Sequence, residues 1–469
     1  MGREELEALR KEELIDVILA QAEQIAQLQA AFGQLQADHE ALKLKFEQNQ
    51  KKPPTTSKNS SQPPSKDQKG NQPKDRRKRR HGPPLGHAKH ERKLVAQADE
   101  VVNVVPQDCS HCHADLSGET GRLVQVNQIT ELPEAKAQVV EVRQYEVVCP
   151  ECQQAQVQAP PSGLEMQRAF GARLEATVVY YRQEQHMSYE RTQKALLDLF
   201  GVEISQGGID EIMKRAGKRA FQEVAGFQAT IQESAVIHCD ETSSRVDGDN
   251  WWEWVFCTFN TVLHVIRFNR SVDVIREVMG QSQAEVWGSD CWGPQLKAPA
   301  RERQLCLAHQ LRNLQAVVDE NPLLFWPQAM QALFRAAIHL HNQRAQLPPD
   351  QFSAEIARIE RVCDWLLQRS LSPPKARRLQ RRYQKYRQAL FVFLYRTDVD
   401  PTNNVAERAL RPSVIHRKVT GGFRSGWGAK TYAALASVID TAELSGIRAF
   451  DAIQSLFGPP ALPIPAGGE

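Results

Sequence analysis

The hydrophobic pattern of the chain contains a strand-forming run from Ala235 to Val246, which reads AVIHCDETSSRV. Its apolar part ends on a carboxylate, Asp240, and the turn-forming residues 247–250 follow. Two more strand-like runs come next, at 251–259 and 262–268, then a helical pattern at 272–279 and a strand at 285–290 that ends on Asp290. If the two acid-bearing strands lie side by side, both carboxylates lie at one rim of a sheet.

The first 50 residues carry an apolar heptad pattern. Two interleaved sets recur every seven residues, namely Leu14, Gln21, Leu28, Leu35 and Leu42, and Ile18, Ile25, Phe32, His39 and Phe46. Such a seam is buried only against a partner helix. A coiled coil that forms a homodimer or higher homo-oligomer is therefore favoured over a single amphipathic helix that folds back on the body.

Residues 51–92 lack apolar periodicity and are rich in Pro, Ser, Lys and Gln, which is typical of a disordered linker. The segment from Lys51 to Lys93 holds 14 Lys and Arg and three Asp and Glu, whereas the whole chain has a net charge of only +3. Five basic residues are consecutive, Arg76, Arg77, Lys78, Arg79 and Arg80. Basic charge confined to one segment indicates an arm that binds a polyanion such as DNA, although a solubilising tail would share this composition.

Two CxxC pairs, Cys109/Cys112 and Cys149/Cys152, are separated by 36 residues with strand-like patterns. Four thiolates in two turns suit a tetrahedral structural Zn²⁺ ion. The pairs therefore predict a zinc ribbon with four cysteine ligands within residues 93–165. A redox dithiol is the alternative, but it would need only one pair.

Residues 166–230 have helical periodicity, and Ser188 and Ser205 are the expected N-caps of the second and third helices. A short turn that contains Gly201 separates these two helices. A helix, a short turn and a capped helix with a basic end are typical of a helix-turn-helix DNA-binding region. An ordinary helical hairpin fits the same pattern, so both interpretations stay open.

The sequence pattern of residues 301–397 predicts a mostly helical insertion between two halves of a catalytic core. Cys306 and His309 near its start have the spacing of half a metal site, but no second half follows nearby, so core packing or a hydrogen-bonded pair is favoured. Residues 369–387 near its end contain eight Lys or Arg and no acid. This basic helix indicates a DNA-facing surface more than a solvated face.

Residues 398–457 contain Glu407, a third acid that could form a metal site together with Asp240 and Asp290. Asp400 and Pro401 are the expected N-cap and first-turn proline of a helix that carries it. A capping box, with Asn404 as the N-cap and Glu407 reaching back, is the local alternative.

That alternative leaves the arginines beside Glu407 unexplained. On a helix, Arg411 shares the face of Glu407 and Arg408 lies beside it. A carboxylate flanked by arginines fits a phosphodiester site, in which the acid holds a metal ion and the arginines hold phosphate. Arg417 and Lys418, followed by the glycine-rich residues 421–430, are further candidates for contact with a DNA backbone.

The order of these features along residues 1–457 resembles the DDE transposases of the insertion-sequence 66 (IS-66) family. The motifs that carry the resemblance are the Asp-Glu-Thr at 240–242, the two CxxC pairs, the CLAHQLR at 306–312 and the NNVAERALRP at 403–412. The resemblance implies an RNase H-like catalytic domain, binding to terminal inverted repeats, and cleavage and joining of DNA. It places the three catalytic acids on Asp240, Asp290 and Glu407, and hard oxygen ligands of this kind suit two Mg²⁺ or Mn²⁺ ions per active site.

The expected fold class is multidomain α+β, with an RNase H-like core split between residues 231–300 and 398–457 and a tail at 458–469. Two other functions stay open: a non-catalytic DNA-binding regulator, and an RNase H-like nuclease that cuts but does not join. No apolar run is long enough for a membrane helix and residues 1–14 do not resemble a secretory signal, so a cytoplasmic, nucleoid-associated protein is expected. Whether companion proteins of the element take part stays open.

Overall fold

The computed structural model describes residues 27, 33–36, 38–40, 56, 58–60, 93–161, 163–165 and 168–458. They fall into two compact units, the first comprising residues 1–68, 144–192 and 206–469 and the second residues 69–143 and 193–205. Most of the predicted heptad seam and all of the basic run at 76–80 lie outside the described residues. Among the described residues, none of the helices combines the length and the apolar character that crossing a bilayer requires.

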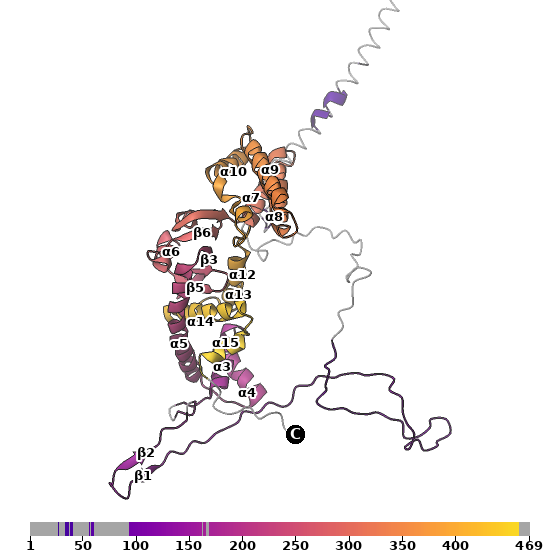
Figure 1. Ribbon diagram of the computed structural model, residues 1–469, viewed down its shortest axis with the longest axis vertical. Helices are drawn as coiled ribbons and strands as arrows, with labels where there is room; N and C mark the ends of the chain where they lie inside the picture. Colours follow the sequence, from indigo (N-terminus) through magenta and orange to yellow (C-terminus); the bar gives the residue numbers. More distant parts are fainter. Residues whose placement is uncertain are drawn as a thin grey trace, which may run out of the picture. The chain divides into compact units, whose positions relative to one another are not determined.

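The first unit is a mixed α/β structure, which confirms the mixed class expected from the sequence (Figure 1). Its strands are β1 (Glu146–Val148), β2 (Ala155–Val157), β3 (Val236–Val246), β4 (Asp249–Cys257), β5 (Val262–Arg267), β6 (Ala284–Ser289) and β7 (Ala300–Leu305). Its helices up to β7 are α3 (Ala172–Gln183), α5 (Gln206–Glu233), α6 (Val272–Met279) and the short 3-10 helix η2 (Gln295–Lys297), and α4 (Tyr189–Phe200) crosses into the second unit.

After β7 the chain is helical. The elements are α7 (Leu307–Glu320), α8 (Phe325–Asn342), α9 (Pro349–Leu367), α10 (Pro374–Lys385), η3 (Arg387–Ala389), α11 (Val392–Tyr395), α12 (Asn404–Ala409), α13 (Arg411–Thr420), α14 (Gly426–Leu444) and α15 (Ala449–Ser455). The segment from α7 to α11 has its own apolar core, built around Trp326, Phe334 and Tyr383 and continuous with Val286 and Leu305 of the sheet. The predicted helical insertion is therefore present, but it starts six residues later than expected, because residues 300–305 form the fifth strand of the large sheet.

The large sheet has the strand order β5-β4-β3-β6-β7. β3, β4 and β5 form an antiparallel meander, whereas β6 and β7 run parallel to β3. Parallel neighbours need a crossover, and α6 supplies it between β5 and β6. The sequence pattern predicted every strand of this sheet except β7, whose polar and charged residues, ARERQL, hide its apolar ends.

Alternation along the strands divides the sheet into two faces. One face, which includes Ile237, Trp254 and Trp287, packs against α6 and the end of α5. The opposite face includes Val255 and Cys257, which pack against α12, and farther along it packs against α14. We call this second face the α12 face. Side chains alternate between the two faces along β3, so His238 and Asp240 lie on the α12 face and Glu241 lies on the other face.

The helical caps follow the sequence in part. The hydroxyl of Ser188 accepts a hydrogen bond from the backbone N–H of Arg191, which confirms the predicted N-cap of α4. The next helix, α5, extends through 28 residues to Glu233 and is much longer than its pattern indicated. Asp400 and Pro401 do not begin a helix, contrary to the prediction: they lie in the loop before α12, whose N-cap is Asn403.

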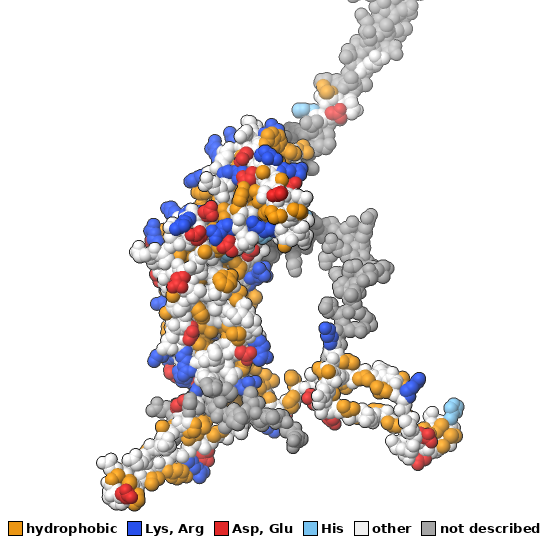
Figure 2. All heavy atoms as spheres, in the orientation of Figure 1, with side chains coloured by type: hydrophobic (Ala, Val, Ile, Leu, Met, Phe, Trp, Pro, Cys, Tyr) orange, Lys and Arg blue, Asp and Glu red, His pale blue; other side chains and the backbone are white. Residues whose placement is uncertain are grey.

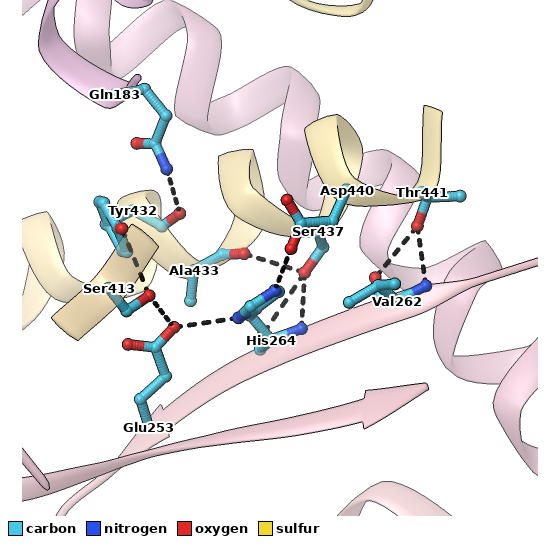
Figure 3. A network of polar contacts seen from close by, with 10 residues as sticks. All are labelled: Gln183, Glu253, Val262, His264, Ser413, Tyr432, Ala433, Ser437, Asp440 and Thr441. Atoms are coloured by element: carbon cyan, nitrogen blue, oxygen red, sulfur yellow. Dashed lines mark hydrogen bonds and ion pairs between the residues drawn. The ribbon is translucent and has the colours of Figure 1, made fainter. Parts of the chain in front are cut away.

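A buried polar network fastens α13 and α14 to the α12 face (Figure 3). The imidazole of His264 lies between two carboxylates, with Nδ1 2.9 Å from Glu253 and Nε2 2.9 Å from Asp440. The hydroxyl of Ser413 on α13 donates to the same oxygen of Glu253 at 2.6 Å. Burial alone lowers the pKa of His264, but the hydrogen bonds that its imidazole donates to Asp440 and Glu253 raise it to about 9.

Helix α14 also provides hydrogen-bond partners for the free backbone groups at the edge of β5. The Ser437 hydroxyl accepts the backbone N–H of His264, and the Thr441 hydroxyl contacts both the N–H and the carbonyl of Val262 (Figure 3). An edge strand whose backbone groups were left open would be a template for pairing with another chain. Here hydroxyls from α14 take the place of a sixth strand.

The raised pKa of His264 makes stability depend on pH. A histidine whose pKa is raised by folding stabilises the folded state fully when the pH is below 6.5, its pKa in the unfolded chain. This contribution is lost as the pH rises through about 9, its pKa in the folded chain. A shift of this size corresponds to roughly 3 kcal/mol. We expect His264→Gln to lower the free energy of unfolding at pH 6 and to lose less stability between pH 6.5 and 9.5 than the unsubstituted chain, as measured by denaturant titrations.

The matched control is His339→Gln, because His339 is an exposed histidine on α8. It should leave the pH dependence of unfolding unchanged. An equally steep loss of stability in the His264→Gln chain would show that the network does not hold a charged imidazole.

Candidate active site

Pairing between β3 and β6 brings Asp240 and Asp290 together. The parallel register joins Val236 to Val286 and His238 to Gly288, and each acid lies two residues beyond the last of these pairs. Asp290 follows the end of β6, as the sequence predicted. Asp240 does not end its strand, however: β3 runs on to Val246, and only its pairing with β6 ends at His238. Asp240 therefore lies in mid-strand, where the edge of β3 becomes open.

Glu407 approaches these two acids from α12, which packs on the same face of the sheet. The pKa of Asp240 is raised well above its usual value, first by burial and then by the negative charges of Glu241, Asp290 and, more weakly, Glu407. Only the hydrogen bond from the N–H of Glu241 opposes this effect, and no cation in the described part of the chain does so. The three acids that the sequence singled out thus interact electrostatically although they are distant along the chain.

A buried amide, that of Asn403, fixes the start of α12. Its side-chain nitrogen donates to the carbonyl of Cys239 at 2.8 Å, and its side-chain oxygen lies 3.2 Å from Nδ1 of His238. Its backbone N–H donates to the sulfur of Cys306, the residue at the N-terminus of α7. Because Cys239 precedes Asp240 directly, Asn403 joins α12 and α7 to the strand at the position of the first acid.

The capping box, which was the local alternative, is not formed, and the prediction of one continuous helix through Arg411 is wrong. Asn404 is the first residue of α12 and not its N-cap, and the side chain of the actual N-cap, Asn403, makes no capping hydrogen bond. The backbone N–H of Glu407 donates to the carbonyl of Asn403, as in an ordinary helical turn. α12 ends at Ala409, and Arg411 begins a separate helix.

The cation beside Glu407 is Arg312 of α7, the last residue of the CLAHQLR motif, for which the sequence predicted no contact with this acid. The Arg312 guanidinium lies 3.2 Å from Oε1 of Glu407, and Nδ1 of His309 lies 3.4 Å from the same oxygen. The flanking arginines of the sequence prediction lie elsewhere. The side chain of Arg408 donates to the carbonyl of Asn404, and Arg411 is exposed.

Of the two predicted basic residues of α13, one is engaged within the structure. The guanidinium of Arg417 donates to the carbonyl and hydroxyl of Ser243 and so fastens α13 to β3. Lys418 is exposed. The glycine-rich segment that follows adds a short parallel bridge between Phe423 and Val246 rather than lying free.

Glu241 lies on the opposite face, in a cluster that the sequence did not predict. Its carboxylate accepts hydrogen bonds from Arg270 at 2.6 Å and from Gln295 at 2.7 Å. The Arg270 guanidinium stacks between two indoles, 4.4 Å from the ring centre of Trp252 and 3.9 Å from that of Trp292. The backbone N–H of Trp292 in turn donates to Asp290 at 2.9 Å, which links this cluster to the second acid.

The two CxxC pairs form turns of the same design, each described within its own unit. In each turn the N–H of the first cysteine bonds the carbonyl five residues on, and the N–H four residues on bonds the carbonyl of that cysteine. The residue at that fourth position, His113 or Gln153, has a positive φ of about 60°. Backbone hydrogen bonds within the turn lower the pKa of Cys109 and of Cys149.

The chain matches the model of a known protein family over more than half of its length. Residues 167–431 match the family described as the Transposase IS66 family, a span that includes all three acids. No curated protein matches the sequence significantly. The mixed sheet with its many helices is compatible with the catalytic domain of a DDE-type enzyme, and the family implies an enzyme that acts on nucleic acid. The chain therefore belongs to the Transposase IS66 family.

Proposed function

We propose that the chain is a DNA transposase that binds the terminal inverted repeats of an insertion sequence and catalyses metal-dependent strand cleavage and strand transfer. The observation that carries this proposal is the convergence of Asp240, Asp290 and Glu407. They come from a mid-strand position, a strand end and a separate helix, and two of them raise the pKa of the third. Like charges collected in this way at a partly buried place are typical of a site for divalent cations.

The topology of the sheet supports an RNase H-like core. An RNase H-like core has three antiparallel strands followed by two strands that run parallel to the first. The large sheet has this arrangement, in the order β5-β4-β3-β6-β7. The first two acids lie on the central strand and just after its parallel neighbour. The insertion from α7 to α11 then separates them in sequence from α12, which returns to the sheet with the third acid.

The donor set of the three acids fits Mg²⁺ or Mn²⁺. Carboxylate oxygens are the ligands that these hard ions prefer, and the half-buried charge of Asp240 has no compensating cation in the described part of the chain. The three carboxylates would hold a pair of such ions, whose chemistry is to activate the attacking water or 3′-hydroxyl and to stabilise the leaving oxygen.

The residues of the chain would act by holding the metal ligands in fixed positions. The β3–β6 pairing fixes the spacing of Asp240 and Asp290, and Asn403 fixes α12, so that the donors stay in place when the nucleophile is exchanged. Cleavage uses water and joining uses a 3′-hydroxyl, and both are phosphoryl transfers at the same site. No covalent intermediate with the enzyme is needed.

Basic side chains near the acids support DNA binding. Burial raises the pKa of Cys291, the residue after Asp290, and the positive charges of Arg382 and Lys385 of α10 oppose this rise, so these two cations act close to the second acid. Lys and Arg side chains are numerous around this helical part of the molecule (Figure 2). We propose that α10, Arg408, Arg411 and Lys418 hold the DNA backbone, together with the basic arm at residues 76–80 and a helix-turn-helix-like region at 166–230.

We further propose that the two CxxC turns hold one structural Zn²⁺ ion, with ligands Cys109, Cys112, Cys149 and Cys152. Their matching backbone hydrogen bonds, which lower the pKa of the first thiol of each pair, support this, since the thiolate is the form that binds zinc. The coiled coil at residues 1–50 would pair two chains and so bring two element ends together.

The first test is to replace the acids by their amides. We expect Asp240→Asn, Asp290→Asn and Glu407→Gln each to abolish cleavage of a duplex that carries an element end, with Mg²⁺ present, because each removes a metal ligand. DNA binding by gel shift should persist. Asp249→Asn, a substitution at an exposed position on the neighbouring strand, is the control and should keep full activity. Full activity in one of the three variants would remove that residue from the site.

The products of the same assay separate transposition from its two alternatives. A target plasmid is included in the reaction. Joined products support the transposase, whereas cleavage without joining would indicate a nuclease. Specific binding with no divalent-dependent nicking would indicate a non-catalytic regulator.

The second test concerns stability. Because Asp240 is half-buried among like charges, we expect Asp240→Asn to raise the melting temperature in EDTA, by at least about 2 °C for a domain of this size. Saturating Mg²⁺ should stabilise the unsubstituted chain, by about 2.7 kcal/mol at 100 times the dissociation constant, and should not stabilise the variant. Equal stabilisation of both chains by Mg²⁺ would place the ion elsewhere.

The third test is metal analysis. After dialysis that removes weakly bound ions, we expect about one zinc per chain, and a loss of that zinc in Cys149→Ser. Less than about half an equivalent in a chain with intact thiols would contradict the ribbon.

A further inference from the structure

Three side chains of metal-ligand type meet beside α7 in a cluster separate from the zinc ribbon. Cys306 is at the N-terminus of α7, His309 is in its first turn, and Glu407 comes from α12. One ligand atom of each lies within 4.8 Å of the other two, and in the described part of the chain this is the only such group. The sequence showed only its first half, because the carboxylate follows about a hundred residues later.

The spacing of the cluster fits a small tetrahedral ion. Nδ1 of His309 lies 3.4 Å from Oε1 of Glu407. Two ligands at about 2.0–2.1 Å from a tetrahedral Zn²⁺ ion are about 3.3–3.4 Å apart. The same Nδ1 atom is buried and has no hydrogen-bond partner among the described residues, so its approach to the carboxylate is not a hydrogen bond. A buried nitrogen of this kind needs a partner, and the described residues do not supply one.

The donor chemistry selects the class of ion. A thiolate, an imidazole and a carboxylate suit a borderline-soft ion such as Zn²⁺, whereas Mg²⁺ prefers oxygen ligands alone. The sulfur of Cys306 already accepts the backbone N–H of Asn403 at 3.1 Å, a contact that a thiolate strengthens. The thiol proton would be released to solvent when the ion binds.

Arg312 occupies the charge position that the ion would take. Its guanidinium lies 3.2 Å from the same Oε1 atom of Glu407, and its buried Nε has no partner in the described part of the chain. The side chain is 29% exposed, so it can move toward solvent. A cation that makes one side-chain hydrogen bond to the described residues can be displaced by an ion that three ligands hold.

We propose that Cys306, His309 and Glu407 bind one Zn²⁺-class ion, and that this ion withdraws Glu407 from the catalytic pair of Mg²⁺ ions and so inhibits the enzyme. The inhibition rests on the proposed function, because it needs Glu407 to be the third catalytic acid. The binding site itself does not. The Zn²⁺-class ion and the catalytic Mg²⁺ ions compete for the carboxylate of Glu407. The active site is complete only when this carboxylate binds the Mg²⁺ ions.

Binding is tested without activity, by adding Co²⁺ as the probe to the full chain with zinc already in the ribbon. We expect a thiolate-to-cobalt charge-transfer band that is absent from Cys306→Ser, in which the hydroxyl keeps the hydrogen-bond acceptor but loses the thiolate. Cys291→Ser, at a half-buried thiol outside the cluster, is the matched control and should retain the band. Arg312→Gln should bind Co²⁺ more tightly, because it removes the competing cation. A band of equal strength in Cys306→Ser, or no band in the unsubstituted chain, would overturn the proposal.

Inhibition is tested by titrating Zn²⁺ into the cleavage assay at saturating Mg²⁺. The concentration for half-inhibition should rise at least about tenfold in Cys306→Ser, since loss of a ligand weakens binding by at least as much as loss of a supporting contact. Equal inhibition of both chains would overturn the competition for Glu407. If the chain has no Mg²⁺-dependent cleavage, the proposed function fails while the cobalt band still decides the metal site.

Discussion

Repulsion among three like charges is the constraint on which the rest of this structure depends. Asp240 is half-buried; burial raises the pKa of its carboxylate, and the negative charges of Glu241, Asp290 and Glu407 raise it further. Side chains that repel one another stay together only if the backbone that carries them is held firmly from elsewhere. Here the β3–β6 pairing holds two of them, and the buried amide of Asn403 holds the helix of the third.

The two faces of the sheet divide this work between them. On the α12 face, the network around His264 and the anchor of Arg417 fix α13 and α14, which follow α12 directly. On the other face, Arg270 between two indoles holds Glu241 beside Asp240. Both arrangements are expensive in buried charge and each is satisfied by several hydrogen bonds, as buried ionic groups require. Their combined effect is a rigid frame around one open strand edge.

The sequence was most informative where one strong pattern decided the outcome. Alternation and turn residues located β3 to β6, and the chemistry of Asp240, Asp290 and Glu407 singled out the three acids that interact in the fold. It was least informative where tertiary contacts override local preference. Asp400 and Pro401 have the signature of a helix start, yet the bonds of Asn403 to Cys239 and Cys306 set the start of α12 later. The polar sequence of β7 likewise gives no strand signal, because pairing with β6 and not alternation makes it a strand.

Contacts that join distant parts of the chain could not have been derived from spacing. Glu407 meets Arg312 and His309 across about a hundred residues, and no local rule selects these partners over the nearby Arg408.

The cover of the β5 edge has a consequence for synthesis on the ribosome. The hydroxyl of Thr441 that satisfies Val262 lies 179 residues further along the chain. At translation rates of about 5–20 residues per second, the strand emerges on the order of 10–40 s before the helix that covers it. During that interval the edge of β5 in the nascent meander lacks the hydroxyl groups that later satisfy it, and its backbone groups are open to pairing with another strand.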